Sequence, residues 1–203
     1  ETVGLLPTGE MITDARFQIA VMPDAGNLPK LIEEEVYRDA GGVLLEDLYS
    51  IEITDLTVET AGLTEAVLMT DEVAGDPTEA DPYDQLGDVW YTSISLPADT
   101  KGVVMEIIDT QASDLDLFFG EGLTPLAATE LGRSTSASSF EYLSFLDLPE
   151  GAYWVMVQNW GGDVGSPEEF TLAGALVPDT ASTNFAVSGP SSVIEREAFD
   201  LEV

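Results

Sequence analysis

The chain of 203 residues contains no cysteine and no histidine, and it has six basic residues against 39 acidic ones. Without cysteine and histidine, this chain alone cannot form a Ser-His-Asp triad, a cysteine nucleophile or a Cys/His zinc site. The net charge of −33 repels nucleic-acid phosphates and anionic lipids, so we expect neither nucleic acid nor a membrane as a partner. The absence of cysteine excludes a disulfide framework, but it does not indicate in which cellular compartment the protein lies.

Long apolar runs are also missing. Runs such as residues 103–105 are far shorter than the roughly 20 residues that span a bilayer. No signal peptide is visible at Glu1, and the chain begins on a strand-like segment. We therefore expect the chain to be a fragment of a longer precursor or a processed product.

Apolar residues make up 44% of the chain, which is enough for a packed core and excludes a disordered acidic tail. Self-repulsion at a charge of −33 disfavours the compact state unless ions screen it. The composition therefore predicts a halophilic or marine setting, or one rich in divalent cations.

Strand-like patterns recur along the chain, with turn residues between them. Residues 50–59 alternate apolar and polar side chains with period two, and a short acidic helical turn is expected near residues 31–36. The strongest later segments are 89–96, 102–109, 114–120, 140–145, 152–160 and 170–177. This spacing predicts an all-β fold, an antiparallel β-sandwich preceded by a small β module.

Composition divides the chain into four parts. Residues 1–70 are expected to form a small β module, either a fibronectin-like remnant or an N-terminal β extension. Residues 71–88 are rich in acids, proline and glycine and predict a linker. Residues 89–178 are expected to form the sandwich, and residues 179–203 a strand-rich tail that begins a further module.

Two segments of the predicted sandwich carry a family resemblance. Asp-Leu-Asp-Leu-Phe at 114–118, and Pro-Glu-Gly-Ala-Tyr-Trp-Val-Met-Val at 149–157 after 142–148, resemble the bacterial pre-peptidase C-terminal domain (PPC). The resemblance covers about residues 76–178. With flanking segments such as 51–57, the chain looks like the region that follows the catalytic part of large secreted subtilisin-like proteases of marine bacteria.

The resemblance implies a non-catalytic, jelly-roll-like β-sandwich attached to a secreted hydrolase. Domains of this family are often removed during maturation, and their proposed roles are secretion, solubility and attachment to insoluble substrates. Related collagen-binding domains bind calcium near their N-terminal linker. The catalytic protease domain itself is absent from this chain.

Acidic residues form the first candidate site. Four of them precede a predicted strand, namely Asp76, Asp81, Asp84 and Asp88. The Asp-Leu-Asp-Leu motif supplies two more, Asp114 and Asp116. In a sandwich these two groups could approach each other. Calcium takes six to eight oxygen ligands, which such loops provide. A solvated acidic linker is the alternative, and the spacing does not match an EF-hand loop. Asp114 and Asp116 share one strand face, where a structural role or metal ligation is favoured over a glycosidase pair.

Aromatic residues form the second candidate site. Tyr153 and Trp154 lie on opposite faces of one predicted strand, and Trp160, Trp90 and Tyr91 accompany them. Exposed rings could stack on a sugar or a peptide, whereas rings on covered faces would belong to the core. Trp160 precedes two glycines and is the one expected to be exposed. Residues 134–139 are rich in serine and threonine and are expected to form a flexible loop.

These observations predict an extracellular, non-catalytic accessory region of a secreted protease. Its expected partners are an extracellular protein or polysaccharide substrate, or its own parent protease. Calcium is the only cofactor that the sequence suggests. The alternative is an extracellular structural subunit that self-assembles into oligomers or filaments by strand exchange or edge pairing. That alternative depends on chain ends that are strand-like and lack obvious partners.

Overall fold

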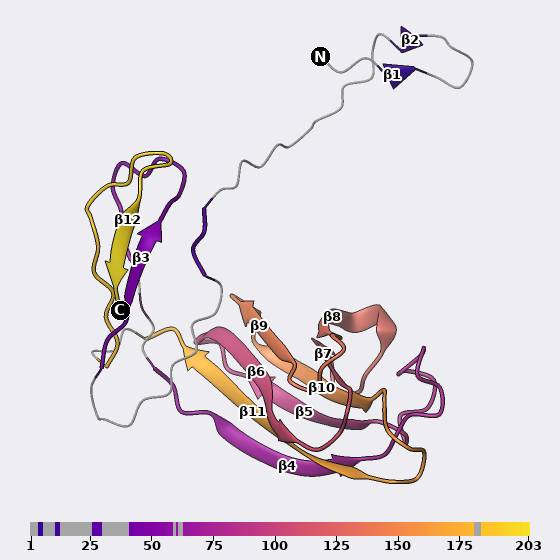
Figure 1. Cartoon of the computed structure of the whole chain (residues 1–203). Coiled ribbons are helices and arrows are strands. Elements are labelled where there is room, and N and C mark those ends of the chain that lie inside the picture. The colour runs from indigo at the N-terminus through magenta and orange to yellow at the C-terminus, as the bar shows by residue number, and fades with distance from the viewer. Residues whose placement is uncertain are drawn as a thin grey trace. The chain divides into compact units, whose positions relative to one another are not determined.

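A computed structural model describes residues 4–5, 11–12, 26–29, 41–58, 60, 63–180 and 184–203 (Figure 1). The chain forms two compact units. One comprises residues 59–186, and the other combines residues 1–58 with residues 187–203. The sandwich is therefore inserted in sequence between two parts of the other unit, and residues 187–203 group with the N-terminal part of the chain.

Residues 59–186 form two four-stranded antiparallel sheets, which confirms the predicted all-β sandwich. The first sheet has the order β5-β10-β7-β8, formed by Trp90–Leu96, Gly151–Asn159, Leu115–Glu121 and Glu130–Ser134. The second has the order β4-β11-β6-β9, formed by Val67–Val73, Glu168–Pro178, Thr100–Thr110 and Tyr142–Leu146. A single 3-10 turn, η1 (Ala127–Thr129), precedes β8 in this part of the described chain.

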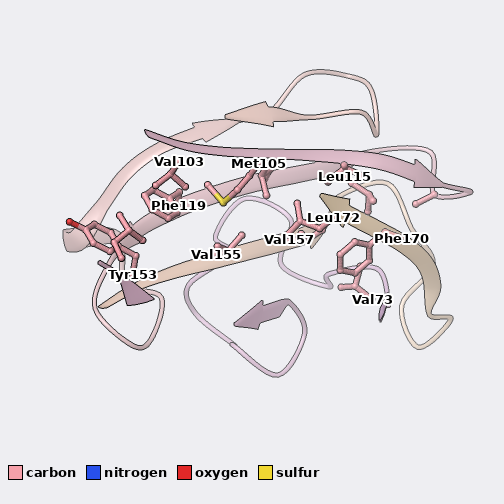
Figure 2. Close-up of a cluster of buried hydrophobic side chains, with 14 residues drawn as sticks. Val73, Val103, Met105, Leu115, Phe119, Tyr153, Val155, Val157, Phe170 and Leu172 are labelled. Carbon is pink, nitrogen blue, oxygen red and sulfur yellow. The ribbon is translucent and has the colours of Figure 1, made fainter. Parts of the chain in front are cut away.

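The main core lies between the two sheets (Figure 2). It follows from the period-two alternation of the strands, which directs every second side chain inward. On β7 these inward residues are Leu115, Leu117 and Phe119, all fully buried. Phe119 stacks on Tyr153 of β10 with ring centres 5.4 Å apart. The alternation visible in the sequence is therefore the pattern that forms this core.

A second apolar cluster lies on the other face of the first sheet. Phe118, Trp154 and Met156 are buried there, and Tyr83 and Leu86 pack against them. The Tyr83 ring meets the rings of Phe118 and Trp154 edge-on at 6.2 and 6.1 Å. Central strand β10 is consequently buried on both faces.

Residues 74–89, hereafter the covering segment, supply this second contact. The sequence predicted a linker over residues 71–88, but Tyr83 and Leu86 in it cover the sheet. The Tyr83 hydroxyl also donates a hydrogen bond to Glu130 on β8. Burial and the Glu130 carboxylate raise the pKa of Tyr83 above its ordinary value. Two apolar residues among many acids thus turn an apparent linker into part of the fold.

The sandwich also begins earlier than predicted. Strand β4 (67–73) lies in the part assigned to the first module and the linker, yet it pairs with β11 from Gly174 to Glu168. Strand β8 was not predicted either, although it pairs with β7. Val73 enters the main core at the end of β4, which explains why this strand belongs to the sandwich.

Among its described residues, the other unit contains two short antiparallel pairs. β1 (Gly4–Leu5) pairs with β2 (Met11–Ile12), and β3 (Leu44–Leu48) pairs with β12 (Phe199–Glu202). Both terminal strands therefore have partners within the chain, so the expectation of unpaired ends is wrong.

Two other sequence expectations concern this unit, a strand over residues 50–59 and a helical turn near residues 31–36. The predicted strand over residues 50–59 is reduced to isolated bridges at Ser50 and Ile53. The expected helical turn at 31–36 lies outside the described residues. Within the described part of the chain, no helix is long and apolar enough to cross a membrane.

Candidate functional site

Four connections of the sandwich lie at one end. β4 ends and β5 begins there, as the pairing of Val73 with Glu168 and of Trp90 with Val157 shows. The same antiparallel register places the β6–β7, β8–β9 and β10–β11 connections at this end. We call residues 74–89, 111–114, 135–141 and 160–167 the loop end. Loops carried on a rigid sandwich are where binding residues concentrate.

Asp76 holds the covering segment to β10. It is only 4% exposed, and its carboxylate accepts hydrogen bonds from the Thr78 amide at 2.8 Å and from Gln158 of β10 at 2.6 Å. The Thr78 hydroxyl lies 3.0 Å from Asp76 and 2.8 Å from Asp84. Asp81 accepts the Tyr83 amide at 3.1 Å and closes a local turn. These three aspartates therefore have structural partners already.

Asp116 lies in a buried acidic group. It is directly opposite Gln158 in the strand register and is 8% exposed. Burial, followed by the charges of Asp114 and Glu141, raises the pKa of Asp116 to about 7, and the Arg133 guanidinium opposes this shift. Asp116 therefore keeps its proton to a higher pH than an ordinary aspartate does.

Asp114 and Glu141, the two acids beside Asp116, differ in their hydrogen bonding. Burial and the charge of Glu141 raise the pKa of Asp114, and one Asp114 oxygen, Oδ1, is buried with no hydrogen-bond partner among the described residues. Glu141 is buried and accepts hydrogen bonds from the Ser134 hydroxyl and the Ser136 amide. The residues predicted as a flexible Ser/Thr loop thus stabilise a buried carboxylate.

The six aspartates predicted as a calcium site gather near the loop end but do not form one cluster. Asp76 and Asp84 share Thr78, Asp114 and Asp116 share Glu141, and Asp88 lines a separate groove described below. Within the part of the chain that the structure describes, no group of three or more acidic side chains is placed to hold a metal ion. Calcium binding stays a prediction, with Ca²⁺ titration as its test.

Two of the three predicted aromatic ligand residues belong to the core. Trp154 is completely buried and donates its indole N–H to Thr129 at 3.1 Å. Tyr153 is buried on the opposite face, and its hydroxyl donates to the Pro149 carbonyl at 2.9 Å. A ligand cannot reach either ring, so the prediction of direct contact is wrong for both. β10 is covered on both faces, which is the physical reason.

Trp160 behaves differently because it follows the last residue of β10. It is 45% exposed, while its amide donates to the Asp114 carbonyl at 3.0 Å. The Ser139 hydroxyl donates to the Ala112 carbonyl at 2.6 Å, which ties exposed Phe140 to the same connection. Trp160 and Phe140 therefore flank residues 111–114, with their backbone held in place.

A groove of about 410 Å³ opens elsewhere on the loop end. It is lined from residues 72–75, 87–90 and 164–167. The segments approach closely at Gly75, whose amide donates to the Asp163 carbonyl at 3.2 Å. A side chain at Gly75 would place its Cβ 2.0 Å from the Gly162 carbonyl oxygen. Only glycine permits this contact, which joins two walls of the groove.

The residues that line the groove are mixed in character. Val73, Val89 and Trp90 are apolar, and Val73 and Val89 are buried. Glu72 and Asp88 are the acidic residues of the lining. Sequence reasoning named Asp88 and Trp90 for different sites and missed Glu72, because the pairing of β4 with β11 was not recognised.

No family model matches the sequence, and neither does any curated protein. Among solved structures, the chain is similar to the pre-peptidase C-terminal domain of a collagenase from Bacillus anthracis. The identity is 10% and the TM-score 0.38, over 60% of this chain and 100% of that one. We draw no functional conclusion from this likeness.

Proposed function

We propose that this chain is a non-catalytic accessory region of a secreted protease, which attaches the enzyme to protein or polysaccharide outside the cell. The observation that carries the proposal is the exposure of Trp160 at the loop end, whereas Trp154 and Tyr153 in the preceding strand are buried. A tryptophan with a fixed backbone and an exposed ring provides a large contact area at low entropic cost.

The segments that resemble the PPC family support the proposal. Residues 114–118 and 149–157, far apart in the sequence, contribute neighbouring strands β7 and β10 of the first sheet. The motif therefore belongs to the central scaffold that positions the loop end. Its most polar member, Asp116, is buried beside Gln158, which favours the structural role over a glycosidase pair.

Substitution of Trp160 tests attachment. The full chain is mixed with insoluble collagen or with chitin particles, and the fraction that sediments with them is measured. We expect Trp160→Ala to reduce the bound fraction severalfold, since removal of a stacked aromatic costs about 1–3 kcal/mol. Leu146→Ala is the matched control, because Leu146 is also exposed but lies at the opposite end of the sandwich. Equal binding by wild type and Trp160→Ala on both materials would refute the proposal.

A further inference from the structure

We propose that the groove at the loop end binds an arginine or lysine side chain presented by an extended segment of a partner polypeptide. This inference rests on the proposed function and names the ligand class for it. The groove is distinct from the Trp160 surface, so separate substitutions test the two.

The lining of the groove matches a side chain with an apolar stem and a cationic head. Val89 and Trp90 are apolar residues of the lining, and Glu72 and Asp88 are acidic ones. Arginine and lysine bury their methylene stems against apolar atoms and keep their charge at polar groups. Carboxylates bind guanidinium and ammonium groups through charge-assisted hydrogen bonds.

The tryptophan of the groove is held in one orientation. Its indole N–H donates to Asp71 Oδ2 at 2.8 Å, and its ring meets the Phe170 ring edge-on at 5.2 Å. Asp71 and Trp90 come from β4 and β5, so this hydrogen bond also connects the two sheets. A fixed wall reduces the ordering cost of binding.

Strand edges beside the groove suit an extended partner. In the described part of the chain, β4 is the edge of one sheet and β5 the edge of the other. The groove lies where β4 ends, and Val67 and Leu68 at the other end of β4 are exposed. A segment that adds along β4 would gain main-chain hydrogen bonds and could place one side chain in the groove.

The charge of the chain selects the partner. The sandwich unit has two basic residues, Lys101 and Arg133, which form ion pairs with Asp147 and Glu130. None of the residues that line the groove is basic. A second copy would bring another charge of −33, so repulsion disfavours it and attraction favours a cationic segment.

Peptide titration tests the inference on the full chain. The probe is a blocked, labelled peptide of about nine residues that alternates valine and threonine and carries one central arginine. Its partner probe has glutamine at the centre. We expect the wild type to bind the arginine peptide about tenfold more tightly than the glutamine peptide, at moderate salt. The double variant Glu72→Gln/Asp88→Asn should lose this preference.

The control variant is Asp99→Asn/Glu150→Gln, which removes the same charge from exposed positions in the β5–β6 and β9–β10 connections, at the end of the sandwich opposite the groove. It should keep the preference for arginine. If both double variants weaken binding equally, or if the glutamine peptide binds as well as the arginine peptide, general charge attraction explains the result and the inference is wrong. Dimerisation of the wild type in sedimentation experiments that the peptide does not reverse would also overturn it.

The two proposals fail separately. If Trp160→Ala abolishes attachment to particles while the groove variant keeps the arginine preference of the wild type, the attachment proposal stands and the groove inference falls. If the groove variant loses the preference but Trp160→Ala leaves attachment unchanged, the groove binds cationic peptides and the Trp160 proposal falls. Thermal unfolding of each variant confirms that it is folded.

Discussion

Removal of the ionisable group at Asp116 should make the stability of the fold less sensitive to a rise in pH from about 4 to 8. Asp116 is buried beside Asp114 and Glu141, and the pKa of Asp116 is raised to about 7. A carboxyl whose pKa is higher in the folded state than in the unfolded chain favours folding when it is protonated. Its ionisation therefore costs stability as the pH rises from the ordinary value of 3.8 towards 7.

The magnitude follows from the two pKa values. Each pKa unit corresponds to about 1.4 kcal/mol, so a shift from 3.8 to about 7 costs about 4 kcal/mol at pH 8. At pH 5 the unfolded chain is ionised and the folded one is not, and the cost is about 1.5 kcal/mol. An asparagine side chain at this position would carry no charge in either state. The stability gained by Asp116→Asn should therefore grow by about 2.5 kcal/mol between pH 5 and pH 8.

Urea unfolding of wild type and Asp116→Asn at pH 5, 6, 7 and 8, followed by tryptophan fluorescence, measures this difference. Trp154 is buried in the cluster next to Asp116, so its emission reports the unfolding of this region. Asp109→Asn is the control, because it removes one charge from an exposed position on β6. We expect the control to show no growing gain with pH.

A constant difference between wild type and Asp116→Asn across this pH range would refute the reasoning. It would mean that Asp116 titrates alike in the folded and unfolded chain, and that the neighbouring carboxylates do not share its buried environment. A stability gain that falls as the pH rises would have the wrong sign and would refute it more directly.

Two further predictions concern the covering segment and the overall charge. Gly75→Ala should destabilise the fold by about 1–3 kcal/mol in urea unfolding, because the new Cβ would lie 2.0 Å from the Gly162 carbonyl oxygen. Gly122→Ala is the control. Its new Cβ would contact no other atom, but Gly122 has a positive φ, so this variant measures the cost of backbone strain alone. Sodium chloride should raise the melting temperature by screening the charge of −33. A melting temperature independent of salt would contradict this.

The strands of the sandwich could be predicted because each carries a local signal. β7 places apolar residues at its inward-facing positions, whereas β10 is a continuous apolar run from Ala152 to Val157; glycines or turn residues lie at the ends of both. β5, β6, β9 and β11 alternate as β7 does, and their bounds lie close to the predicted ones. Period-two alternation reports burial of one face, and it is readable without knowledge of the partner strand.

β4 and β12 show why the division into domains was harder to predict from the sequence than the strands were. Five of the seven side chains of β4 are exposed, so it has almost no local pattern, and pairing with β11 about 100 residues away defines it. β12 pairs with β3 across the whole inserted sandwich. Composition describes neighbours in sequence, whereas both of these strands are determined by contacts between residues far apart in it.

The acidic residues illustrate the same limit within the candidate site. Their number suggested one cluster, yet burial separates them into groups with different chemistry. Asp76 accepts hydrogen bonds from amide and hydroxyl donors, whereas Asp116 has carboxylate neighbours and a raised pKa. Glu141, which completes the second group, stands between Phe140 and Tyr142 and resembles any solvent-facing residue of a strand. Glu141 is buried because the folded chain brings it next to Ser134 and Ser136, which donate hydrogen bonds to its carboxylate.

The covering segment connects these separate features. Because β7 and β10 are apolar on both faces, the first sheet needs a cover on its outer side, and Tyr83 and Leu86 provide it. The same segment must then return to β5 through Asp88, which places this residue in the lining of the groove beside the end of β4. Val89, the next residue, belongs both to the second apolar cluster and to the lining of the groove. A chain with the same sandwich but a solvated linker would therefore lack both the cover and this side of the groove.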